Sequence, residues 1–279
     1  MGAIITLTTD FGLSDAYVAA MKGVILGINP EVKLIDVCHT IKPQNILQAA
    51  FVLGTAYQYF PMKTVHLAVV DPRVGTERRA VILRTPSADF VAPDNGVLSY
   101  VIQELSGEQA SDNSNLQQRK LAPKLEAVEI NKSQFWRTPT SNTFHGRDIF
   151  APVAALLSLG FPPINFGEAI TSLTMLPLAG SYQRPDGSLV GNIIHSDNFG
   201  NLITNIRGSD LSQIKGPFVI EVADQVISGL SNNYDEGRGL LALVGSSGYL
   251  EVALRGGSAS AFLEAEVGSE VKIRRKQEK

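Results

Sequence analysis

Runs of β-branched residues alternate with longer amphipathic stretches over the first hundred residues. The pattern predicts strands at residues 4–8, 33–37, 65–70 and 80–83, and helices at residues 16–28 and 46–59. Strands separated by helices favour parallel pairing, because each parallel strand needs a long crossover connection. We therefore expect an α/β domain built on a Rossmann-like, mostly parallel sheet.

Two of these helices carry possible N-terminal caps. Ser14 precedes the first helix, and Asn45 with Gln48 forms a variant of the capping box before the second. A short helix is expected from about Asn95 or Gly96 to Ile102. We expect both caps to set the start of their helices.

A polar stretch without apolar periodicity, residues 106–120, interrupts the pattern and is interpreted as an exposed insertion. After it, residues 127–130 are typical of a strand. Residues 149–159 predict a buried helix, which Gly160 and the following prolines terminate. Residues 1–180 are therefore expected to form the α/β domain.

The composition changes at residues 179–191, where Gly, Ser, Pro and Asp gather. From there on, short strands dominate the pattern, at residues 189–194, 218–222, 240–244, 249–253 and 270–273. We expect a second, all-β domain over residues 190–279.

Composition narrows the classes of function. The chain has 279 residues, 44% of them hydrophobic, and 24 basic against 27 acidic residues give a net charge of -3. This balance disfavours nucleic acid as a partner, because phosphate binding needs a basic surface. Cys38 is the single cysteine, so an internal disulfide is excluded. With neither a signal-like start nor an apolar run of about 18 residues, a cytoplasmic protein without a membrane partner is expected.

Polar residues follow the first predicted strand, at Asp10 and Asp15. A carboxylate at the carboxyl edge of a parallel sheet suits the two hydroxyls of a ribose. Both residues are equally explained as turn and capping residues. Asp10-Phe11-Gly12 matches a kinase signature, but no room precedes it for a glycine-rich loop. A dinucleotide site fails too, because only Gly12 follows the strand.

Two further segments carry charged groups. Asp71 follows the third predicted strand, with Arg78 a turn later, and could orient a water; an exposed Asp-Arg pair in a surface turn is the simpler alternative. His145 lies beside Phe144 and could act as a base, although a lone histidine is more often structural. Asp148 could cap the helix that follows.

The second domain holds two polar motifs. Asp197, Phe199 and Asn201 offer a carboxylate, an aromatic face and an amide, which suffice to hold an ammonium group and a purine. Ser246 and Ser247 lie in a glycine-flanked stretch, which Arg255-Gly256-Gly257 follows shortly afterwards. Both motifs are also typical of β-turns.

In order and spacing, these segments resemble the S-adenosylmethionine hydroxide adenosyltransferase family, the water-using relatives of fluorinase and chlorinase. The likeness spans nearly the whole chain, and its motifs together are far more specific than any one alone. They are Thr9-Asp10-Phe11-Gly12, Val37-Cys38-His39, Val70-Asp71-Pro72, Val74-Gly75-Thr76, Ala92-Pro93-Asp94-Asn95-Gly96, Thr143-Phe144-His145-Gly146-Arg147-Asp148, Phe199-Gly200-Asn201 and Ser247-Gly248-Tyr249-Leu250.

The resemblance implies a barrel-like second domain and a homotrimer with active sites between the first domain of one subunit and the second domain of its neighbour. It implies hydrolysis of S-adenosyl-L-methionine to adenosine and methionine, by attack of water on the ribose 5′ carbon. It also implies contacts with the substrate's parts: Asp10 on the ribose; Asp15, Asp197 and Ser246 on the amino-acid group, with Ser247 beside them; Phe144, Phe199 and Asn201 around adenine; and a backbone contact near Gly256.

The water-activating triad implied by the resemblance is Asp71, Arg78 and His145. Fluorinase has tyrosine where Asp71 stands and lacks the equivalent of Arg78, which places this sequence on the hydrolase side. The chain departs from the family at Arg73, which is usually glycine, at Ser247, which is arginine in fluorinase, and in the length of the polar insertion.

We expect Asp71 and His145 to accept the proton of the attacking water while Arg78 keeps Asp71 ionised. No cofactor or metal is expected, because the histidines are scattered and S-adenosylmethionine is the substrate. Two alternatives stay open. One is halide-dependent cleavage giving a 5′-halo-adenosine, against which the polar triad argues, and the other is a non-catalytic sensor of S-adenosylmethionine or adenosine.

Overall fold

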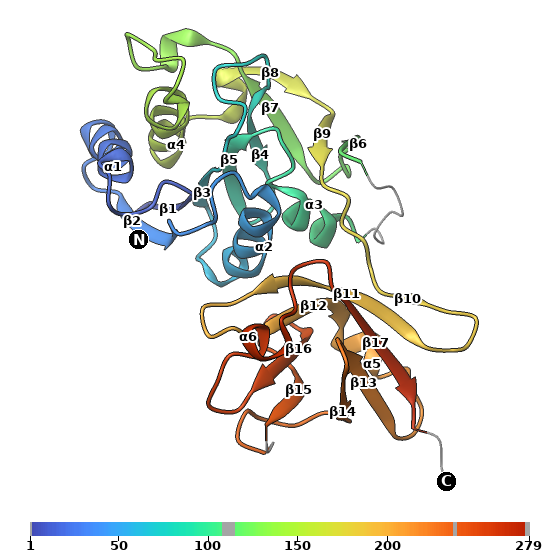
Figure 1. Cartoon of the computed structure of the whole chain (residues 1–279). Helices are drawn as coiled ribbons and strands as arrows, with labels where there is room; N and C mark the ends of the chain where they lie inside the picture. The colour runs from blue at the N-terminus through green and yellow to red at the C-terminus, as the bar shows by residue number, and fades with distance from the viewer. Residues whose placement is uncertain (1, 108–114, 237–238, 277–279) are drawn as a thin grey trace. The chain divides into compact units, whose positions relative to one another are not determined.

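The computed structural model describes residues 2–107, 115–236 and 239–276. The chain divides into two compact units, Met1–Leu178 and Ala179–Lys279 (Figure 1). Among the described residues, no helix has the length and apolar character needed to span a bilayer. The expected α/β first domain and all-β second domain are confirmed.

A seven-stranded mixed sheet forms the centre of the first unit, in the order β2-β1-β3-β5-β4-β7-β8. Its parallel part consists of β2 (Lys33–Cys38), β1 (Ile4–Thr9), β3 (Thr64–Val69) and β5 (Ala88–Pro93). The antiparallel part consists of β4 (Ala80–Arg84), β7 (Glu126–Ile130) and β8 (Gly167–Ile170). The sheet is parallel on the side where residues 10 and 71 follow their strands.

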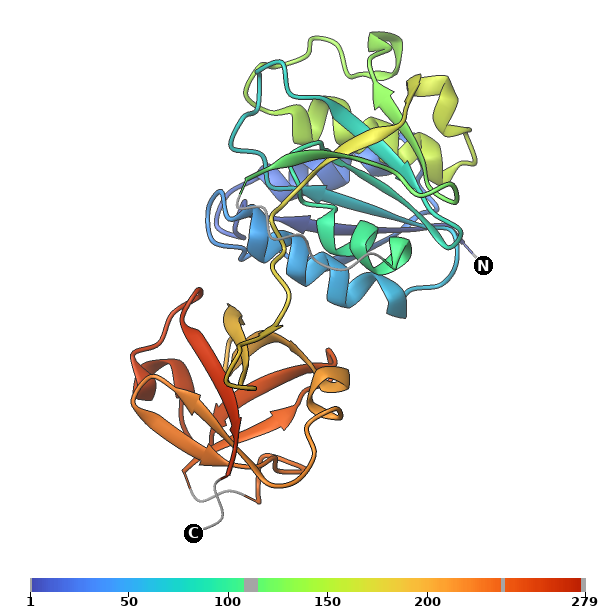
Figure 2. The same cartoon turned by 90° about the vertical axis from the view of Figure 1, so that its right-hand side faces the viewer.

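Helices cover both faces of this sheet (Figure 2). Apolar side chains of α1 (Tyr17–Ile28) and α4 (Ala151–Ser158) fill the core on one face. Those of α2 (Ile46–Ala56) and α3 (Ser99–Ser106) fill the core on the other. Burial on two faces explains why the central strands are nearly continuous apolar runs. The short 3-10 turns are η1 (Tyr57–Tyr59), η2 (Ser133–Phe135) and η4 (Pro163–Phe166).

One of the two predicted helix caps is wrong. Ser14 does not cap α1, which begins after Ala16 with no side-chain cap. Asn45 does cap α2, because its side-chain oxygen accepts from the backbone N–H of Gln48 over 2.9 Å. The reciprocal half of the box is replaced, since Gln48 Oε1 accepts from the N–H of Lys42 instead.

The polar insertion expected at residues 106–120 lies partly outside the described residues, at 108–114. Its last part is ordered as the strand β6 (Gln117–Lys120), which pairs with β9 (Ser172–Met175). No apolar pattern predicts this strand, because two-stranded backbone pairing at a surface needs none.

The second unit is a nearly closed, barrel-like antiparallel sheet in the order β14-β13-β17-β11-β12-β16-β15, with β10 paired to β11 (Figure 1). The strands are β10 (Tyr182–Gln183), β11 (Leu189–Ser196), β12 (Leu202–Arg207), β13 (Phe218–Val222), β14 (Gln225–Ser228), β15 (Leu240–Val244), β16 (Tyr249–Leu254) and β17 (Glu270–Arg275). Two short helices, α5 (Gly208–Leu211) and α6 (Ala259–Leu263), complete the unit.

His66 lies in the core of the first unit and makes the fold sensitive to acid. Its side chain on β3 is 1% exposed, its Nδ1 is 2.8 Å from the hydroxyl of Thr6, and its ring stacks on Phe90. Burial lowers the pKa of His66 to about 4. An exposed histidine in the unfolded chain titrates near its ordinary pKa of about 6.5.

Between these pKa values the unfolded chain binds a proton that the folded chain does not. The free energy of unfolding is therefore expected to fall as pH falls through this window, by about 3 kcal/mol in total. Urea unfolding of the wild type and of His66→Asn at about pH 6.5 and pH 4.5 measures this contribution. An equal loss of stability in both proteins would contradict it.

Candidate active site

The carboxyl edge of the parallel strands brings the first two candidate carboxylates to neighbouring positions. β1 and β3 pair in parallel, with Thr9 opposite Val69. Asp10 follows β1 directly, and Asp71 follows β3 after Val70. Ligands of open α/β sheets bind at this edge, where the strand order changes direction.

Asp71, Arg78 and His145 form one contiguous cluster. Arg78 Nε donates to both carboxylate oxygens of Asp71, over 3.0 and 2.9 Å, and Nη2 donates to Oδ2 as well. The same Nη2 lies 2.9 Å from Nδ1 of His145. The side chains of Asp71 and Arg78 are each only 5% exposed. The alternative of an exposed Asp–Arg pair in a surface turn is therefore wrong, and the three residues lie together.

Hydrogen-bond chemistry settles the tautomer of His145. An arginine N–H can only donate, so Nδ1 of His145 accepts and the neutral ring carries its proton on Nε2. Burial and the positive charge of Arg78 lower the pKa of His145, although the negative charges of Asp71 and Asp148 oppose that shift. His145 is thus held neutral, with an N–H group free to donate.

The turn between Asp71 and Arg78 touches the loop before His145 at one tight point. Gly75 has φ +78°, and a Cβ at this position would lie 2.3 Å from the carbonyl oxygen of Asn142. Only glycine allows both the left-handed backbone and this approach. The contact joins the segment that carries Asp71 and Arg78 to the segment that carries His145.

Gly75→Ala is expected to separate these two segments. The strained backbone and the contact with Asn142 together are expected to cost about 1–3 kcal/mol of stability. The displaced triad is expected to lower kcat/KM by about a hundredfold in the reaction that the family resemblance implies. Gly160→Ala is the matched control, because Gly160 has φ +92° but nothing within 4 Å of a built Cβ. Equal activity in both variants would contradict the role of this contact.

The remaining candidates of the first unit surround an aromatic cluster. Asp10 is half-buried, and its Oδ2 accepts from the N–H of Gln44 over 2.8 Å. Phe144 packs edge-on against Phe11 and Tyr17, with ring centroids 5.8 and 5.2 Å away. Asp15 is exposed in the bend before α1, where it does not serve as the N-cap. These positions leave Asp10 and Asp15 available to a ligand.

In the second unit, Asp197, Phe199 and Asn201 share one turn between β11 and β12. Asp197 Oδ1 accepts from the N–H groups of Phe199 and Asn201, each over 2.9 Å, and Oδ2 accepts from Asn201 Nδ2 over 3.0 Å. The ring of Phe199 is 76% exposed. The local structure is the expected turn, and it presents an aromatic face beside a carboxylate.

Ser246, Ser247 and Gly256 lie in turns at the two ends of β16. Gly245 and Gly248 close the first turn by a hydrogen bond over 2.9 Å, and Gly256 adopts φ +71° in the second. Ser246 is exposed in this turn and Ser247 is half-buried. The turn geometry that the sequence predicted is present at both places.

Sequence reasoning missed Glu251, beneath the first of these turns. It is 6% exposed, accepts from the hydroxyl of Tyr234 over 2.6 Å, and its Oε2 would lie 2.5 Å from a Cβ on Gly245. Burial and the charge of Asp197 raise the pKa of Glu251, against the effect of the Tyr234 hydrogen bond. A charged residue in the otherwise apolar strand β16 was the available signal.

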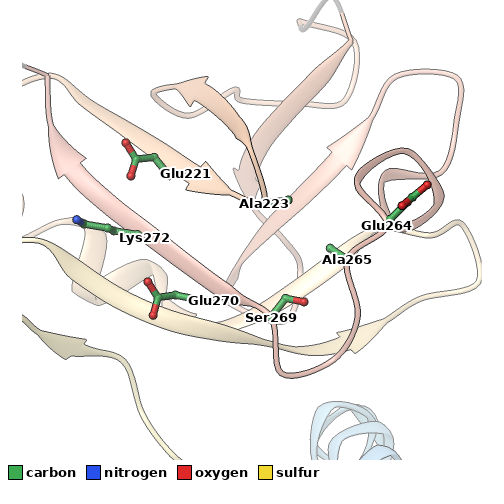
Figure 3. A pocket seen from close by; sticks show the side chains of 7 residues that line it. All are labelled: Glu221, Ala223, Glu264, Ala265, Ser269, Glu270 and Lys272. Carbon is green, nitrogen blue, oxygen red and sulfur yellow. The ribbon is translucent and has the colours of Figure 1, made fainter.

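Elsewhere in the second unit, a pocket of about 430 Å³ opens beside β13 and β17 (Figure 3). Its lining consists of Glu221, Ala223, Glu264, Ala265, Ser269, Glu270 and Lys272. None of the candidate residues lies there. Within the described ranges, no three or more His, Cys, Asp and Glu residues are grouped as metal ligands would be.

Comparison with known proteins gives consistent matches over both units. The family model described as SAM hydroxide adenosyltransferase N-terminal domain matches residues 5–167, and the corresponding C-terminal domain model matches residues 191–272. An (R)-S-adenosyl-L-methionine hydrolase from Salinispora tropica is 36% identical over 270 residues, covering 96% of this chain and 97% of that protein.

More distant and structural relatives agree. A fluorinase from Nocardia brasiliensis is 27% identical and covers 76% of this chain and 73% of its own length. The crystal structure of an uncharacterized conserved protein from Thermotoga maritima superposes with a TM-score of 0.84 at 34% identity, covering 97% of this chain and all of that one.

Proposed function

The chain belongs to the S-adenosylmethionine hydroxide adenosyltransferase family, and from that membership we propose that it hydrolyses S-adenosyl-L-methionine to adenosine and L-methionine. The observation that carries the proposal is the buried cluster of Asp71, Arg78 and His145 at the carboxyl edge of the sheet. Full-length relatives named as hydrolases support it.

Catalysis of this reaction chiefly requires that the protein position and polarise one water molecule. The sulfonium of the substrate is already a good leaving group, so the bond from C5′ to sulfur breaks as the water oxygen bonds to C5′. The electron pair of the broken bond stays on sulfur, and methionine leaves as a neutral thioether. The proton lost by the water needs an acceptor in the site.

Asp71 is that acceptor in our proposal. Arg78 donates to Oδ2 of Asp71 from both Nε and Nη2 but to Oδ1 from Nε alone, so Oδ1 keeps a second lone pair with which to accept from water. Sequence analysis predicts that His145 accepts a proton from the water, and we propose instead that it donates a hydrogen bond. Its Nε2–H donates to the water oxygen and orients it, because Nδ1 is already engaged by Arg78.

The substrate contacts follow the sequence expectation and stand as proposals. We propose that Asp10 holds the ribose, that Asp15, Asp197, Ser246 and Ser247 hold the amino-acid group, that Phe144, Phe199 and Asn201 surround adenine, and that Gly256 offers its backbone. A homotrimer with active sites at subunit interfaces, a cytoplasmic location, and catalysis without cofactor or metal belong to the same proposal.

Halide-dependent cleavage is the second candidate, because fluorinases are among the relatives. The buried Asp71–Arg78 pair disfavours it, since a halide ion carries no proton and needs no base in the site.

The decisive experiment incubates the purified protein with S-adenosylmethionine in ¹⁸O-enriched water, with and without chloride, and identifies the nucleoside by mass. Adenosine carrying ¹⁸O at the 5′ position is expected in both samples. A chlorinated nucleoside would contradict the proposal and show halide-dependent cleavage instead. Binding of S-adenosylmethionine without any product would contradict the proposal and support a non-catalytic sensor.

A further inference from the structure

Asp148 carries a buried charge that the proposed chemistry does not use. Its side chain is fully buried and lies in the π-helix η3 (Gly146–Phe150), directly after His145. Arg147 donates to both of its oxygens, from Nε over 2.7 Å and from Nη2 over 2.8 Å. A carboxylate enclosed in this way cannot touch a substrate.

The same residue also fastens the other end of the loop that precedes it. The N–H of Ser141 donates to Asp148 Oδ2 over 2.9 Å, and the N–H of Arg137 donates to the carbonyl oxygen of Asp148 over 2.8 Å. Residues 137–144 contain no helix or strand. Asp148 therefore supplies the bonds that close this irregular segment on itself.

Two side chains of the candidate site lie at the end of this loop, where Phe144 is its last residue and His145 follows directly. His145 reaches Arg78 from it, with 2.9 Å between Nδ1 and Nη2. The guanidinium of Arg147 lies over the ring of Phe144, 5.0 Å from its centroid, and the same ring packs against Phe11. Arg147 thus bridges the buried carboxylate and the aromatic ring.

We propose that Asp148, through Arg147 and Ser141, is a positioning residue that fixes His145 against Arg78 and Phe144 against its aromatic neighbours. The proposal rests on the function proposed above. Burial alone would raise the pKa of Asp148, yet hydrogen bonds from Arg147 and Ser141 hold that pKa below its ordinary value, so the anchor stays charged.

Asp148→Asn is the first test, because asparagine keeps an acceptor for Ser141 and removes the charge that faces Arg147. Asp89→Asn is the matched control. Arg84 donates to both oxygens of Asp89 over 2.8 Å, at the edge of the sheet opposite the site. We expect kcat/KM to fall by about tenfold to a hundredfold in Asp148→Asn and to stay within about twofold in Asp89→Asn.

A spectroscopic measurement separates positioning from lost stability and from failure of the proposed function. With ¹⁵N-labelled histidine and no substrate, His145 is expected to show an accepting Nδ1 and a protonated Nε2, assigned by the loss of its signals in His145→Gln. In Asp148→Asn the two shifts are expected to move toward the average of the two tautomers. In Asp89→Asn they stay in place.

Arg147→Lys serves where Asp148→Asn does not fold. Lysine keeps the charge beside Asp148 but loses the forked donors and the planar group over Phe144. A rise in KM of about tenfold, with a smaller fall in kcat, is expected. A folded Asp148→Asn or Arg147→Lys protein with wild-type kinetics and unchanged His145 shifts would overturn the proposal, even if the hydrolase activity itself is established.

Discussion

Asp71→Asn is expected to lower kcat by about a hundredfold to ten-thousandfold, because asparagine cannot accept the proton of the attacking water. Its amide oxygen still accepts from Arg78, so the site keeps its shape. Binding of S-adenosylmethionine is expected to change by no more than a few-fold, because Asp71 acts on the water in the transition state. Single-turnover rates and calorimetric binding measure the two quantities separately.

Asp89→Asn is the matched control for this substitution as well, since it removes the carboxylate charge from an Asp–Arg pair at the opposite end of the strands from the candidate site. If Asp71→Asn turned over as fast as the control, Asp71 would not be the proton acceptor. A loss of binding equal to the loss of kcat would assign Asp71 to holding the substrate instead.

Arg78→Met is expected to damage both stability and catalysis. It leaves the carboxylate of Asp71 without its partner at a position only 5% exposed, which typically costs about 3–5 kcal/mol. It also frees Nδ1 of His145 to carry the proton, and the ring can then adopt the wrong tautomer. Urea unfolding and kcat measure the two effects.

The Arg84–Asp89 pair provides the comparison for stability. Arg84 is 39% exposed, so Arg84→Met is expected to cost no more than about 1 kcal/mol. The double variant Asp71→Asn/Arg78→Met is expected to be more stable than Arg78→Met, because it removes the stranded charge. Equal losses of stability in Arg78→Met and Arg84→Met would show that burial does not determine the cost of breaking the Asp71–Arg78 pair.

The apolar pattern was sufficient to predict the strands whose partners cover both faces, such as β1 and β3. It missed β5, because only residues 80–83 were predicted as a strand and the short apolar run after the tight turn at residues 85–87 was assigned to no element. It also missed β6, whose alternation is between polar residues. The apolar pattern along the chain indicates which residues are buried. Neither a turn nor the pairing of two strands of polar residues changes that pattern.

The candidate site was predictable in its residues and much less so in its geometry. Motif order singled out Asp71, Arg78 and His145, but residues alone favoured a surface turn for the first two. What the sequence could not report is that Phe150 packs against the Arg78 guanidinium, 5.2 Å from it, and that Gly75 touches Asn142. Burial of a pair depends on segments far apart in the chain.

The π-helix that follows His145 has a consequence for how such a site could arise. A π-helical turn amounts to one residue inserted into an α-helix, and each α-helical residue rotates the chain by about 100°. Deleting one residue from 146–150 would restore a regular helix and turn His145 away from Arg78 by roughly that angle. One extra residue at this point in the chain is therefore enough to direct the His145 side chain toward Arg78.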